Sequence, residues 1–117
     1  MDELNHLVRT VAALYRPNAF HNFEHASHVT MAVVKLLSRV GQGVPSDPLI
    51  PFACVFSAMV HDVDHPGVPN HTLVHENAPL AQVYQSRSVA EQNSFDVAWN
   101  LFLESRFDHL RHAVCPP

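Results

Sequence analysis

Apolar residues recur at three- and four-residue spacing along most of the chain, which is typical of amphipathic helices. This spacing predicts helices over residues 2–15, 22–40, 49–60, 70–76, 78–84 and 89–103, and a last helix that begins at about residue 107. No segment shows the alternation of apolar and polar positions that is typical of a half-buried strand. We therefore expect an all-α fold, built as a helical bundle.

The same pattern predicts burial and helix ends. Apolar side chains cover most of the circumference of the helix 49–60, which predicts that this helix is buried. Phe95, Trp99 and Phe102 form an apolar stripe at helical spacing, as is typical of a protein core. Residue types that favour helix N-caps precede three of the predicted helices, and these residues are Ser46-Asp47, Asn70, and Ser86 or Ser88.

Composition narrows the class of protein. The chain has 117 residues, of which 47% are hydrophobic and 15% are charged, as expected for one globular domain. A formal net charge of -4 argues against electrostatic binding of polymeric nucleic acid. Ten histidines outnumber the seven lysines and arginines. Because histidine is the commonest metal ligand and titrates near neutral pH, the composition favours metal or proton chemistry.

The cysteines and the apolar segments indicate the compartment. Cys54 and Cys115 show no CxxC spacing, so we expect reduced thiols in a cytoplasmic setting. The apolar stretch from about Leu49 to Val60 is too short to span a bilayer, and no secretory signal precedes it. We expect no membrane insertion by this segment. The helical pattern is still in progress near Pro117, so we also expect the chain to be cut short of a complete domain.

Several histidines stand next to helix ends. His21 and His25 are one helical turn apart, and His61 and Asp62 end the helix 49–60, with His65 one turn further on. If these ends meet, His25, His61 and Asp62 can bind one metal ion. Imidazole and carboxylate suit zinc, or two divalent ions if the carboxylate bridges them. His21 would then be free to protonate a leaving oxygen.

The HDxDH segment is the more specific of these two signals. An HxxxH spacing arises often by chance in a histidine-rich chain. Ionisable groups at the buried end of an apolar helix, in contrast, carry a desolvation cost of several kcal/mol unless an opposite charge offsets this cost. This cost favours a functional reading of residues 61–65.

Residues 21–26 read HNFEHA and residues 61–67 read HDVDHPG. They resemble the paired signatures HNxxHA and HDxDHPG of class I 3',5'-cyclic nucleotide phosphodiesterases. The similarity continues through Asn70, Tyr84 and residues 88–91. The resemblance implies that residues 1–117 form the N-terminal portion of a phosphodiesterase catalytic domain, with the helical HD-type fold.

The resemblance also implies a role for each residue of the two motifs. His21 would be the general acid that protonates the departing O3′ oxygen. His25, His61 and Asp62 would be zinc ligands, and Asp62 would also bridge to a second divalent ion, Mg²⁺ or Mn²⁺.

Three further residues match supporting positions of the family. His65 and Glu91 match positions that hydrogen-bond metal-bound waters or orient the acid, and Asn22 matches a position that supports the site. Asp64 belongs to the motif without being a first choice as ligand.

The chain departs from the family pattern at several positions. Phe20 stands where most relatives have tyrosine, and His28 replaces the aspartate usual in HAxD. Residues 92–94 read QNS where relatives often show NHH. The later metal-binding aspartate and the glutamine that holds the purine have no match in this chain.

The resemblance implies hydrolysis of the 3'-phosphoester bond of cyclic AMP or cyclic GMP to the 5'-monophosphate, in cyclic nucleotide signalling. The substrate would be a small molecule, and the chain is compatible with a place in a larger multidomain protein. Two alternatives remain open. The first is another HD-type metal phosphohydrolase that acts on linear nucleotides, and the second is a truncated, non-catalytic helical module.

Overall fold

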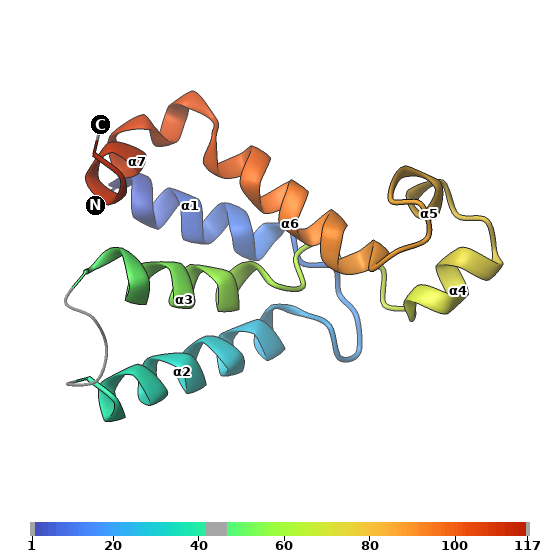
Figure 1. The fold of residues 1–117 in the computed structure, drawn as a ribbon, viewed down its shortest axis with the longest axis horizontal. Coiled ribbons are helices and arrows are strands. Elements are labelled where there is room, and N and C mark those ends of the chain that lie inside the picture. Colours follow the sequence, from blue (N-terminus) through green and yellow to red (C-terminus); the bar gives the residue numbers. More distant parts are fainter. Residues whose placement is uncertain (1, 42–46, 117) are drawn as a thin grey trace.

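The computed structural model describes residues 2–41 and 47–116. The helices are α1 (Asp2–Ala13), α2 (Phe23–Arg39), α3 (Leu49–Val60), α4 (Asn70–His75), α5 (Pro79–Val83), α6 (Val89–Phe102), the 3-10 helix η1 (Ser105–Phe107) and α7 (Asp108–Val114). The described residues contain no strand, which confirms the predicted all-α class. Helices α1, α2, α3 and α6 run along the long dimension, and α4 and α5 lie at the end away from both termini (Figure 1). None of the described helices is both long and apolar enough to cross a membrane.

The main core lies between α1, the C-terminal end of α3, α6 and η1. Leu7 and Val11 lie one turn apart on α1, and at most 1% of either residue is exposed. They pack with Val63 and Phe107, which are fully buried. A smaller cluster of Leu73, Ala81 and Val89 joins α4 and α5 to the start of α6. The two clusters therefore fix the segment that follows α3 between α1 and α6.

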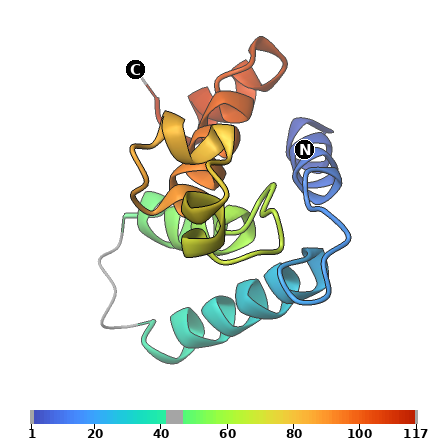
Figure 2. The same cartoon turned by 90° about the vertical axis from the view of Figure 1, so that its right-hand side faces the viewer.

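The predicted burial of α3 was wrong, and the predicted burial of the aromatic stripe was wrong for two of its three residues. Only Ala58 and Val60 of α3 are buried. Phe95 and Trp99 are 65% and 48% exposed, whereas Phe102 is buried as predicted. Helix α2 lies along one side of α3 (Figure 2). An apolar groove of about 250 Å³ lies open between α3 and α6 among the described helices. The apolar pattern predicted a face that is able to pack, but it did not predict whether another segment covers that face.

The predicted caps hold in part. The Asp47 carboxylate accepts a hydrogen bond from the Leu49 backbone N–H at 2.9 Å, whereas Ser46 lies outside the described residues. Ser88 is the N-cap residue of α6, which confirms one of the two predicted positions, and Ser86 is not the cap. Ser88 has a left-handed conformation, and its side chain makes no capping hydrogen bond. Asn70 does not cap its own helix. Its Oδ1 instead accepts a hydrogen bond from the Ala90 N–H at 3.0 Å, so a residue of α4 caps α6.

Candidate metal centre

The first turn of α2 holds His25 in place. Asn22 is the N-cap, and its Oδ1 accepts a hydrogen bond from the His25 backbone N–H at 2.9 Å. Its Nδ2 donates to the Asn18 carbonyl at 2.9 Å, which fixes the cap to the preceding loop. The supporting role predicted for Asn22 therefore has a physical basis in the N-cap geometry.

Tyr15 holds the end of α3 against the end of α1. Its hydroxyl donates a hydrogen bond to the Met59 carbonyl at 2.7 Å and accepts one from the Asp62 N–H at 3.3 Å. Burial raises the pKa of Tyr15 to about 12, so the hydroxyl keeps its proton at neutral pH. The backbone of Asp62, which follows α3, is thus held by a residue that follows α1.

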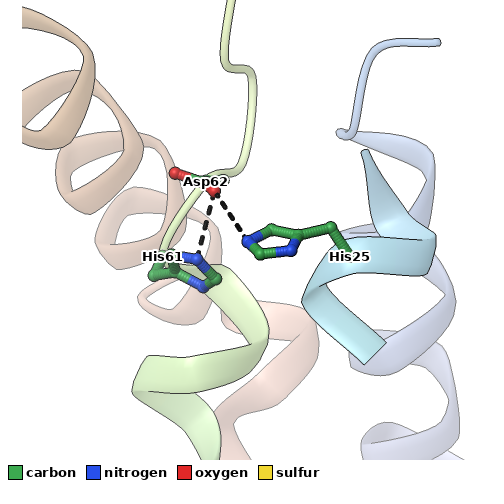
Figure 3. Close-up of side chains that lie close together, drawn as sticks. All are labelled: His25, His61 and Asp62. Atoms are coloured by element: carbon green, nitrogen blue, oxygen red, sulfur yellow. Dashed lines mark ion pairs between the residues drawn. The ribbon is translucent and has the colours of Figure 1, made fainter. Parts of the chain in front are cut away.

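His25, His61 and Asp62 meet between α2 and α3. Each offers one ligand atom, and these atoms all lie within 4.8 Å of one another. Asp62 Oδ2 is 3.1 Å from His61 Nε2 and 3.7 Å from His25 Nε2. Figure 3 shows the carboxylate facing both imidazoles. The structure therefore brings together the three residues that we expected to bind one metal ion.

The tautomer of His61 fits a bound cation. His61 Nδ1 lies 2.7 Å from the Ala58 carbonyl oxygen, so in the neutral ring this nitrogen carries the proton and donates it. Nε2 then presents a lone pair to the Asp62 carboxylate. Two acceptors at 3.1 Å repel each other unless a cation lies between them or the ring is protonated. The donor set is therefore suited to a divalent metal ion.

His21 and His65 lie beside these three residues as a stacked pair. Their ring centroids are 3.8 Å apart with an interplanar angle of 8°. The Gly67 N–H donates to His65 Nδ1 at 2.9 Å, so a neutral His65 carries its proton on Nε2. Burial is the main cause that lowers the pKa of His65, and the neighbouring His21 adds to it. His21 and His25 rings are 6.5 Å apart, which keeps His21 close to the ligand group without joining it.

Glu91 reaches the same region from α6. Asn70 Nδ2 donates to Glu91 Oε2 at 2.9 Å, and this hydrogen bond is the main cause that lowers the pKa of the carboxyl group. His21, His65, Asn70 and Glu91 line one pocket of about 490 Å³. The fold thus places Glu91 in a pocket with the predicted acid.

Asp64 points away from the ligand group. Its carboxylate pairs with Arg16 Nε at 2.9 Å and accepts a hydrogen bond from Asn93 Nδ2 at 3.0 Å. The neighbouring Ser94 donates its hydroxyl to the Val63 carbonyl at 2.6 Å. The polar residues that depart from the family pattern in α6 therefore anchor the loop after α3.

Sequence reasoning missed Tyr15, Asn18 and Asn93. Tyr15 stands at an apolar position of the predicted first helix, which gave no signal that its hydroxyl bonds to α3. Asn18 lies in a connector, where asparagine is common in turns. No local pattern indicates partners that are 29 to 47 residues away.

The chain is similar in sequence to known proteins. The family described as 3'5'-cyclic nucleotide phosphodiesterase matches residues 20–113. The chain is 43% identical, over 97 residues, to a probable 3',5'-cyclic-AMP phosphodiesterase, pde-4, of Caenorhabditis elegans. This match covers 82% of the present chain and 14% of the relative. It is 38% identical, over 86 residues, to isoform F of a Drosophila melanogaster 3',5'-cyclic-AMP phosphodiesterase, covering 74% of this chain and 13% of the relative.

A solved structure has the same fold. The phosphodiesterase domain of the Salpingoeca rosetta rhodopsin phosphodiesterase superposes with a TM-score of 0.83 and 29% identity, over 91% of this chain and 32% of that chain. The chain therefore spans about a seventh of the length of the two curated relatives and about a third of the solved domain. On the match over residues 20–113 and on the identity to these relatives, the chain belongs to the 3'5'-cyclic nucleotide phosphodiesterase family.

Proposed function

We propose that this chain contributes the metal ligands and the acid of a cytoplasmic, metal-dependent phosphodiesterase. The enzyme hydrolyses the 3'-phosphoester bond of cyclic AMP or cyclic GMP to the 5'-monophosphate. The observation that carries the proposal is the convergence of three ligand atoms, from His25, His61 and Asp62, within 4.8 Å. The two curated relatives are cyclic-AMP phosphodiesterases by name, which favours cyclic AMP as the substrate.

His25, His61 and Asp62 would hold Zn²⁺, and the Asp62 carboxylate would also contribute to holding a second ion, Mg²⁺ or Mn²⁺. Imidazole and carboxylate ligands suit zinc, and the family resemblance implies that a further aspartate, outside this chain, joins these three residues. When bound, these ions supply Lewis-acid stabilisation of phosphate charge and lower the pKa of water towards neutrality.

The remaining residues bind and protonate the substrate. A pocket of about 490 Å³ is within the range of small-molecule sites, and its lining includes His21, His65 and Glu91. His21 belongs to this pocket and not to the ligand group, so its ring is free to donate a proton to the departing O3′. The stacked ring of His65 restricts the orientation of His21. Glu91, held by Asn70 and ionised at neutral pH, favours positive charge in the pocket.

Calorimetric titration of the metal-free chain with zinc tests the ligand assignment. We expect His61→Ala and Asp62→Ala to weaken zinc binding by about tenfold or more, because each removes one of three ligands. His71→Ala, at an exposed position on α4, is the matched control and should leave binding unchanged. Equal affinity in all of these variants would refute the ligand assignment.

Hydrolysis assays with zinc and Mg²⁺ or Mn²⁺, carried out on the full-length protein that contains this segment, test the reaction. We expect His21→Ala to lower turnover of cyclic nucleotide by about 10²–10⁴-fold while zinc binding is kept. Preference for linear over cyclic phosphoesters would identify another HD-type phosphohydrolase. Absence of both zinc binding and turnover would identify a non-catalytic helical module.

A further inference from the structure

Asn18 connects the loop before α2 with the loop after α3. Its Nδ2 donates hydrogen bonds to the His65 carbonyl at 2.7 Å and to the His21 carbonyl at 3.0 Å. One amide nitrogen therefore uses both of its protons to bind the backbones of the two stacked histidines. We propose that Asn18 is a positioning residue that aims His21 at the substrate. The proposal rests on the proposed function, because it assigns the orientation of the acid.

The backbone of Asn18 is itself fixed on both sides. Its N–H donates to the Arg16 carbonyl at 2.8 Å, and its carbonyl accepts the hydrogen bond from Asn22 Nδ2 at 2.9 Å. The side-chain amide therefore extends from a fixed point between α1 and α2. A fixed donor can define the distance between its two acceptors.

The loop after His65 is shaped around this amide. A Cβ atom on Gly67 would lie 2.5 Å from Asn18 Oδ1, so only glycine fits beside the amide in its present position. The Gly67 N–H in turn donates to His65 Nδ1 at 2.9 Å, which holds the imidazole as well as its backbone. The Asn18 amide, the Gly67 backbone and the His65 ring thus form one packed unit.

This unit determines where the His21 ring lies. The centroids of the His21 and His65 rings are 3.8 Å apart in a stack. Each ring belongs to a residue whose own backbone carbonyl accepts a hydrogen bond from Asn18. Without the two hydrogen bonds, the loops are free to separate and the stack is lost. A displacement of about 1 Å at a reacting group costs about 10²-fold in rate. The metal ligands are held differently, by the N-cap of α2 and by Tyr15.

Nuclear magnetic resonance of the histidine rings tests the proposal on the 117-residue chain. Asn18→Asp keeps the shape of the side chain and removes both donors. We expect the ring protons of His21 and His65 to lose the upfield shift that a stacked ring produces. The ring signals of the two ligand histidines should keep their positions, and the zinc titration its midpoint. Ser27→Ala, which removes a 2.9 Å hydrogen bond to the Phe23 carbonyl within α2, is the matched control and should keep the stacking shift.

Two results would overturn the positioning role. The first is a stacking shift that persists in both Asn18→Asp and Asn18→Ala. The second is movement of all histidine signals together in Asn18→Asp, because general loosening of the fold would then explain the effect. A merely structural asparagine would lower the melting temperature without a selective change of the His21 and His65 signals.

An activity comparison in the full-length protein that contains this segment separates this proposal from the proposed function. In Asn18→Asp we expect kcat for cyclic nucleotide to fall by about 10²-fold, with KM within about threefold. Hydrolysis of a bis(p-nitrophenyl) phosphodiester, whose leaving group needs no acid, should stay within about threefold of wild type. Equal loss on both substrates would contradict the positioning of the acid. If wild type hydrolyses neither, the proposed function fails, and the ring signals still decide whether Asn18 positions His21.

Discussion

Gly67 is a position where one added methyl group should have a large effect. Its φ is +83°, in a region of backbone conformation that side chains with a Cβ rarely adopt. The Cβ of an alanine there would lie 2.5 Å from Oδ1 and 3.0 Å from Cγ of Asn18. Both the backbone and the neighbouring side chain therefore oppose Gly67→Ala.

The magnitude follows from these two effects. A left-handed conformation costs an ordinary residue about 1–2 kcal/mol. If Asn18 moves to relieve the clash, the two hydrogen bonds from its Nδ2 are lost, at about 1 kcal/mol each. We expect Gly67→Ala to lower the free energy of unfolding by about 3–4 kcal/mol.

Urea unfolding followed by circular dichroism measures this change through the midpoint and the slope of the transition. Gly41→Ala is the matched control. Among the described residues, an added Cβ at Gly41 would meet only the carbonyl oxygens of Ser38 at 3.5 Å and Leu37 at 3.7 Å, which is ordinary contact. We expect Gly41→Ala to change the free energy of unfolding by less than about 1 kcal/mol.

A double variant separates the backbone cost from the clash. In the Asn18→Ala background the clash is absent, so Gly67→Ala should cost only the backbone part, about 1–2 kcal/mol. The reasoning is refuted if Gly67→Ala costs no more than Gly41→Ala. It is also refuted if Gly67→Ala costs the same in both backgrounds.

Two further predictions concern the supports of the site. The pKa of Tyr15 is raised from its ordinary 10.0 to about 12, so its contribution to stability is fully present below pH 10 and is lost as the pH rises to about 12. Alkaline unfolding of Tyr15→Phe should therefore lack the part of the pH dependence that wild type shows in that window. Asn70→Ala should lower the free energy of unfolding by about 1–2 kcal/mol, because it removes the cap at the Ala90 N–H. The same substitution should raise the pKa of Glu91, which a carbon-detected titration measures. Asn100→Ala, at an exposed position of α6, is the control and should change neither the free energy of unfolding nor the pKa of Glu91.

The positions of the helices could be predicted from the chain alone. Apolar spacing and the proline and glycine residues between segments are local signals, and each predicted helix lies within a few residues of an observed one. The ligand group could also be predicted, because HNFEHA and HDVDHPG each place their side chains at a helix end. The sequence predicts candidate metal ligands at these ends, and the family resemblance implies that the two ends meet.

Other features depend on segments far apart in the chain. The burial of α3 and of Trp99 depends on which segments pack over them. The spacing of apolar residues shows only which face of a helix can pack against another segment. The cap of α6 comes from Asn70, 20 residues before Ala90, and not from the serine next to the helix. Asp64 belongs to the HDxDH motif, and the sequence does not indicate that Arg16, after α1, and Asn93, in α6, bind its carboxylate.

The sequence by itself determined an all-α chain with histidine and aspartate at two helix ends, because helix formation and motif spacing depend on neighbouring residues. Only the tertiary structure decided that His21 stacks on His65 and that the ligand atoms of His25, His61 and Asp62 lie within 4.8 Å of one another. It also placed Asn18 between the two loops, 47 residues from one of its acceptors. A hydrogen bond over that separation depends on how the helices pack, and no local pattern of residues encodes it.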